Sequence, residues 1–184
     1  QSGAALALGA PPLLGFAQQS ITLKFHTFMA PQSNVWLNMH KAWMDKVTKD
    51  SDGRIKFEGY PAMQLGGTPP QLFDQAKDGV ADIVWTVPGY QAGRFPITEA
   101  FELPFMVYSS EKASRGLWNY AIKNALSDYK GVKPILFHVH DGSLMHTTKK
   151  PVKTLEDFNG LKVRAPTRQG TKMVTALGAT PVPM

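Results

Sequence analysis

Between residues 22 and 87 the sequence alternates strand-like and helix-like segments, and this order constrains the fold more than any other feature. Residues 22–28 and 54–60 alternate apolar and polar side chains, and residues 82–87 form a mostly apolar third strand. Helix-like segments with short connections separate these strands. Strand, helix, strand, helix, strand is the pattern of right-handed βαβ units, so the sequence predicts an α/β fold with a parallel sheet.

Capping signals support both helices. Ser33 precedes a helix predicted over residues 34–50. Thr68 and Gln71 have the spacing of a capping box, with Pro69 at the first helical position of the second helix.

Further along the chain we expect a long ordered loop over residues 88–104, a helix starting at Ser109 or Ser110, and a strand over residues 134–140. A later strand at 161–165 and a helix at 171–177 begin a second unit. We therefore divide the chain into a first α/β lobe (18–140), an interlobe crossing (141–150) and the start of a second α/β lobe (151–184).

Residues 1–17 carry no charge and resemble the apolar part of a secretory signal peptide. Gly15 and Ala17 supply small residues for a cleavage after Ala17, and Pro11 and Pro12 argue against the alternative of a core helix. A basic start and an initiating Met are absent, so we expect a partial signal peptide of an exported, periplasmic protein.

Composition excludes several classes of protein. The chain has no cysteine, which removes disulfides, thiolate nucleophiles and zinc–cysteine sites. Its formal net charge of +6 comes from scattered Lys and Arg, which does not resemble a nucleic-acid-binding surface. No apolar run approaches the roughly 18 residues of a membrane helix, so we expect no membrane insertion of the mature chain.

Six motifs follow one another along residues 21–184: LKF (23–25), GRIKF (53–57) with QLG (64–66), KDGVADI (77–83), ELPF (102–105), GLKVRAP (160–166) and LGATPVPM (177–184). In this order and at this spacing they resemble the substrate-binding subunits of tripartite ATP-independent periplasmic (TRAP) transporters, the DctP family. The resemblance implies an N-terminal fragment of a two-lobed, type II-like periplasmic binding protein, with a parallel-sheet first lobe and an incomplete second lobe.

The same resemblance implies a function. Such a protein closes over a small organic carboxylate and delivers it to the membrane permease subunits of a TRAP transporter, without catalysis, ATP or a cofactor. Arg164 stands at the family's position for the arginine that binds the ligand carboxylate. A guanidinium offers two parallel donors to a carboxylate. The alternative is a surface Arg that pairs with a neighbouring Asp or Glu.

Other candidate ligand-binding residues follow from the topology, because ligands of α/β proteins bind at the carboxyl ends of strands. Gln32 lies in the loop after the first strand, and Pro88 and Tyr90 lie in the loop after the third, although Tyr90 suits a core position equally well. Sialic-acid-binding relatives carry an arginine before a Thr-Thr pair. Here His146 occupies that place, which favours a smaller or more apolar acid with His146 as a second donor.

The sequence favours a monocarboxylate over a dicarboxylate. Arg164 is the only strongly placed cation, and aromatic residues can supply an apolar wall: Phe28, Trp85, Tyr90 and Phe105.

Two alternatives remain open. His138 and His140, followed by Asp141, have a spacing that metal ligands use, so a metal-dependent hydrolase is possible, although a barrel of that kind needs further ligands and a longer chain. A ligand-sensing lobe of a signalling protein would share the same fold.

Overall fold

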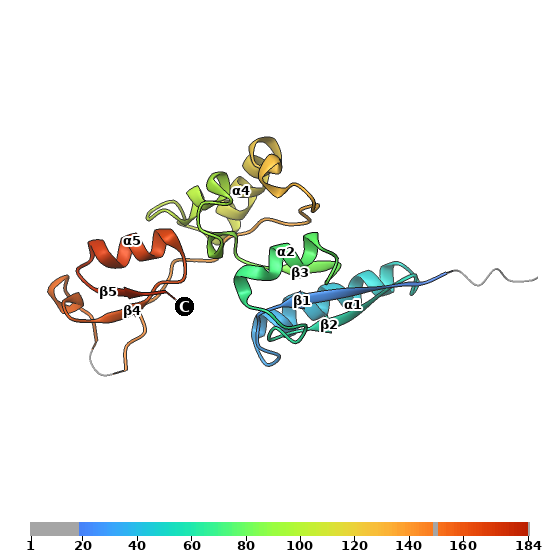
Figure 1. Ribbon diagram of the computed structural model, residues 1–184, viewed down its shortest axis with the longest axis horizontal. Helices are drawn as coiled ribbons and strands as arrows, with labels where there is room; N and C mark the ends of the chain where they lie inside the picture. The colour runs from blue at the N-terminus through green and yellow to red at the C-terminus, as the bar shows by residue number, and fades with distance from the viewer. Residues whose placement is uncertain (1–18, 149–150, 184) are drawn as a thin grey trace, which may run out of the picture.

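The computed structural model describes residues 19–148 and 151–183 of the chain and contains two parallel sheets (Figure 1). In the first sheet, β1 (Ile21–Thr27) lies between β2 (Ile55–Tyr60) and β3 (Ile83–Trp85) and runs parallel to both. In the second sheet, β4 (Lys162–Arg164) pairs in parallel with β5 (Thr180–Val182). The predicted α/β fold with parallel strands is therefore confirmed.

The first predicted helix forms as a π-helical segment, η1 (Trp36–Lys41), that continues into α1 (Ala42–Asp50). The Ser33 hydroxyl accepts the backbone N–H of Trp36 at 3.2 Å, as the cap prediction requires. Trp36 and Met44 are buried against Phe25 of β1. A Cβ at residue 59 would overlap the Trp36 ring, so the helix can lie this close to β2 only because that residue is Gly59.

The second predicted helix begins with η2 (Pro69–Gln71) and continues as α2 (Leu72–Lys77). The capping box between Thr68 and Gln71 is present. Phe73 on α2 is buried in a second core.

This second core gathers residues from the middle of the chain, where Figure 1 shows α4 between the two sheets and to one side of them. It involves α3 (Pro96–Glu99), η4 (Ala100–Glu102), α4 (Ser110–Asn124) and η5 (Leu126–Tyr129). Its buried members are Phe73, Phe95, Leu117, Ala121, Ala125, Tyr129 and Phe137.

The second sheet is covered by α5 (Arg168–Ala176), and a short turn, η6 (Glu156–Phe158), precedes β4. Helix α5 begins three residues earlier than predicted, because the Thr167 hydroxyl accepts the N–H of Gly170 at 3.1 Å and caps it there. Val174 packs with Ala165 and Ala179 in a small separate core.

The strand predicted over residues 134–140 is wrong. The segment has no strand partner among the described residues, and a strand requires one. Val139 instead bonds to a side chain: its N–H donates to the Ser114 hydroxyl at 3.0 Å, and its carbonyl accepts from the same hydroxyl at 3.2 Å.

Within residues 19–148 and 151–183, no helix combines the length and apolar character needed to cross a membrane. The predicted signal peptide lies outside the described residues. The lobe boundaries at residues 140 and 151 stay predictions.

Candidate functional site

The carboxyl ends of β1 and β3 lie at the same edge of the first sheet, because the two strands are parallel neighbours. Phe28 directly follows β1, and η3 (Pro88–Tyr90) follows β3. The Phe28 ring centroid lies 5.5 Å from the ring of Tyr90 and 5.5 Å from that of Trp85. Three of the four aromatic residues expected to form an apolar wall therefore lie together. We call Phe28, Trp85 and Tyr90 the aromatic wall.

Phe105, the fourth expected member, lies apart from the wall. Its side chain is 86% exposed, and its backbone has a φ of 67°. The sequence could not show this, because the backbone of Phe105 adopts an unusual left-handed conformation within a turn.

Two histidines flank Trp85. Its indole N–H donates to Nε2 of His138 at 2.9 Å, and the two rings stack with centroids 5.6 Å apart. On another side, the His40 ring lies 5.1 Å from Trp85. Burial and the neighbouring His138 lower the pKa of His40 to about 4, and burial together with His140 also lowers the pKa of His138. Both rings are therefore neutral near pH 7, and His138 Nε2 acts as an acceptor.

The geometry does not favour the metal-site hypothesis. His138 is committed to Trp85, whereas His140 is exposed and contacts the carbonyl of Asp141. The Asp141 carboxylate accepts the N–H of Ser110 at the start of α4 at 2.9 Å. In the part of the chain that the structure describes, no three His, Asp or Glu side chains gather as metal ligands would.

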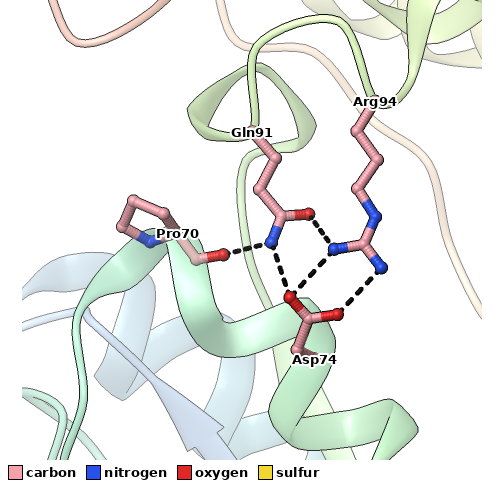
Figure 2. A network of polar contacts seen from close by, with 4 residues as sticks. All are labelled: Pro70, Asp74, Gln91 and Arg94. Carbon is pink, nitrogen blue, oxygen red and sulfur yellow. Dashed lines mark hydrogen bonds and ion pairs between the residues drawn. The ribbon is translucent and has the colours of Figure 1, made fainter.

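The loop that carries Tyr90 is fastened to α2 by a polar network (Figure 2). Arg94 donates from Nη1 and Nη2 to the two carboxylate oxygens of Asp74, at 2.9 and 2.8 Å. Gln91 accepts from Arg94 at 3.0 Å and donates to Asp74 and to the carbonyl of Pro70. These hydrogen bonds lower the pKa of Asp74, and the Arg94 guanidinium also lies 4.3 Å from the Phe73 ring centroid. The network therefore holds residues 91–94, which directly follow Tyr90, against the start of α2.

Glu102 joins the η3 segment to the start of α5. Its carboxylate lies against the backbone of Gly89, and both that backbone and the Thr167 side chain act to lower its pKa. A Cβ at residue 89 would overlap both Glu102 oxygens, so the contact depends on Gly89. Burial, and less strongly the charge of Glu99, raise the pKa of Glu102.

A second acidic contact bridges the same two parts of the chain. Glu99 is 2% exposed, accepts the N–H of Gly93 at 2.7 Å, and forms an ion pair with Arg168 at 2.7 Å. Arg168 is the first residue of α5 and lies four residues after Arg164 in the sequence. The ion pair therefore connects α3 to the segment that follows Arg164.

The structure places the predicted ligand residues as follows. Arg164 ends β4, is exposed, and has no hydrogen bond or ion pair from its side chain to any described residue. Tyr90 and Pro88 share η3, and Glu102 links that segment to Thr167, three residues after Arg164. The alternative of a structural Arg164 that pairs with a nearby carboxylate finds no support in these contacts.

Gln32 and His146 are less well connected. Both side chains are exposed, and neither makes a hydrogen bond to a residue within 19–148 or 151–183. Their ligand-binding roles stay predictions.

Sequence reasoning missed Glu99, Glu102, Thr167 and Arg168 as members of this region. Glu102 stood out only as part of the ELPF motif, and Thr167 was not singled out because the helix was predicted to begin at residue 171. The Glu99–Arg168 pair spans 69 residues of sequence, and no local pattern signals a contact of that separation.

A hollow of about 290 Å³ lies elsewhere, between α1 and β2, and is lined by Trp36, Met44 and Phe57. Its charged residues, Lys41 and Asp45, already pair with each other at 3.6 Å. It offers no free cation to an acid, so we place the candidate site at Arg164, Glu102 and the aromatic wall.

Comparison with solved structures shows close likeness. A TRAP solute binding protein from Rhodoferax ferrireducens T118, in complex with copurified benzoate, is 61% identical with a TM-score of 0.87, and the match covers 90% of this chain and 51% of that one. A marine metagenome TRAP solute binding protein specific for aromatic acid ligands, crystallised with 3-hydroxybenzoate, is 51% identical with a TM-score of 0.87, covering 90% and 52% of the two chains.

Among curated proteins, the outer membrane transporter protein TsaT of Comamonas testosteroni is 26% identical over 180 residues, which is 95% of this chain and 52% of that protein. The chain thus spans about half the length of these relatives. The sequence pattern of the bacterial extracellular solute-binding proteins of family 7 matches residues 25–184. The chain therefore belongs to this family, the DctP family, whose members are substrate-binding proteins and not enzymes.

Proposed function

We propose that the protein binds a small aromatic monocarboxylate in the periplasm and passes it to the permease subunits of a TRAP transporter, without catalysing a reaction. The observation that carries this proposal is Arg164, an exposed guanidinium at the carboxyl end of β4 whose side chain has no partner among the described residues. An arginine of this kind is available to form two parallel hydrogen bonds with a carboxylate.

The contrast with Arg168 supports this assignment. Four residues further along, Arg168 is already neutralised by the buried carboxylate of Glu99. Of these two arginines, only Arg164 keeps its charge free for an anion.

The aromatic wall supports an aromatic acid. Phe28 and Tyr90 are half-buried and lie with tilted rings at the strand ends, where they can cover one face of a ligand ring. The two solved relatives above, which carry benzoate and 3-hydroxybenzoate, support the same class of ligand. Export is supported by the apolar residues 1–17, and delivery to a permease by family membership.

Replacement of Arg164 tests the proposal. In the full-length protein, thermal unfolding is followed with benzoate, 3-hydroxybenzoate, pyruvate and succinate. We expect an aromatic acid at a hundred times its Kd to stabilise the wild type by about 2.7 kcal/mol. Arg164→Ala should lose about 2 kcal/mol or more of binding energy, about 30-fold in Kd.

Arg115→Ala is the matched control, because Arg115 is an exposed arginine on α4 that pairs with Glu111 on the same helix. It removes the same charge and should leave the stabilisation by ligand intact. A wild type that no acid stabilises, or an Arg164→Ala protein that binds as tightly as Arg115→Ala, would contradict the proposal.

A further inference from the structure

Glu102 is the acidic residue next to the proposed ligand site. It ends η4, and its carboxylate lies against Gly89, the neighbour of Tyr90, and is influenced by the side chain of Thr167, three residues after Arg164. The Thr167 hydroxyl oxygen already accepts the N–H of Gly170, so its proton is free to donate to Glu102. The carboxylate is thus held between the segment that carries Tyr90 and the segment that carries Arg164.

Of the four charged side chains in this region, two form an ion pair with each other and two do not. Arg168 and Glu99 form an ion pair at 2.7 Å and neutralise each other. Neither Arg164 nor Glu102 has an ion-pair partner within the described residues. Arg164, at the end of β4, and Glu102, beside Gly89, therefore each carry a charge without an ion pair within the described residues.

Glu102 also lies in surroundings where an added negative charge costs more than in water. It is half-buried, and burial together with Glu99 raises its pKa. Repulsion between like charges grows as the local dielectric falls.

We propose that Glu102 restricts the site to acids with a single carboxylate. The first carboxylate of a ligand neutralises Arg164, and a second would face Glu102, whose charge is offset only weakly by His140, with which it forms no ion pair. Selectivity of this kind arises from repulsion of the wrong ligand and adds nothing to the affinity for the right one. The inference rests on the proposed function and names the ligand charge that the same site accepts.

A purely structural role for Glu102 predicts a different result. If the carboxylate serves only to fill the space between Gly89 and Thr167, a glutamine can replace it, because the amide has the same shape and keeps an acceptor oxygen. Glu102→Gln would then leave the choice between ligands unchanged.

The experiment compares two ligands that differ in charge and hardly in shape: isophthalate, which has two carboxylates, and its monoamide, 3-carbamoylbenzoate. Kd values for both are measured by calorimetry in the full-length wild type and in Glu102→Gln. We expect the wild type to bind the monoamide more tightly than isophthalate. The ratio of the isophthalate Kd to the monoamide Kd should fall about tenfold or more in Glu102→Gln, mainly because isophthalate binds more tightly.

Glu111→Gln is the control for net charge, because Glu111 is an exposed carboxylate on α4, and it should leave the preference unchanged. Retained binding of the monoamide shows that Glu102→Gln is folded. A Glu102→Gln protein with the wild-type preference overturns the inference alone, whereas a wild type that binds neither acid overturns the proposed function with it.

Discussion

His40 is buried among three aromatic rings, and its two nitrogens have no hydrogen-bond partner among the described residues. The ring centroids of Phe25, Trp85 and Trp36 lie 5.0, 5.1 and 6.1 Å away. A charged imidazolium in this place would lose its hydration without compensation, which is why the pKa falls to about 4. The residue behaves as an apolar ring that supports Trp85.

This burial predicts a pH dependence of stability. The neutral form of His40 is favoured in the folded state, where its pKa is about 4, whereas an unperturbed histidine in the unfolded chain has a pKa of 6.5. Stability is therefore full above pH 6.5 and declines as the pH falls towards 4, because the unfolded state binds the proton first. Between pH 7 and pH 5 the free energy of unfolding should drop by about 2 kcal/mol from this residue.

Urea unfolding of the full-length protein at the two pH values measures the drop. His40→Phe removes the titrating group and should lessen the drop, whereas His146→Asn, at an exposed histidine, should not. An equal decline in the wild type and in His40→Phe would exclude His40 as the source.

Among the elements, those with strong local signals form where the sequence predicts them. The capping box at Thr68 and Gln71 and the cap at Ser33 each start a helix, since these side chains satisfy backbone N–H groups within the same turn. The segment 134–140 failed because a strand also needs a partner, and apolar alternation does not reveal one. Tyr90 was predictable in position, because strand ends follow from the βαβ order, whereas Arg164 was singled out by the resemblance to the DctP family.

The Arg94–Asp74 network predicts how firmly the Tyr90 loop is held. Arg94→Lys keeps the charge but loses the two-pronged contact with Asp74 and the flat packing on Phe73. The Asp74 and Arg94 side chains are partly exposed, so we expect a modest cost of about 1 kcal/mol in the free energy of unfolding. Hydrogen exchange of the backbone amides in residues 88–94 should be faster in Arg94→Lys than in the wild type.

Lys46→Ala provides the comparison, because Lys46 pairs with Asp50 on an exposed helix face and should cost only about 0.3 kcal/mol. If Arg94→Lys leaves both stability and loop exchange at wild-type values, the network does not hold the loop.

At the scale of the whole molecule, two acidic residues connect parts that the sequence separates widely. Glu99 reaches Arg168 across 69 residues, and Glu102 reaches Thr167. Both contacts bring the start of α5 close to the segments around η3, and the proposed ligand site places Arg164 and the aromatic wall on either side of them. Local patterns cannot predict such contacts, because they arise from the packing of separate cores.

A crystal structure of the full-length protein with benzoate tests the central claim most directly. We predict the ligand carboxylate in two parallel hydrogen bonds with the Arg164 guanidinium, at about 2.7–2.9 Å, and the ring against Phe28 and Tyr90. A carboxylate bound by other residues, with Arg164 turned away from it, would contradict the account.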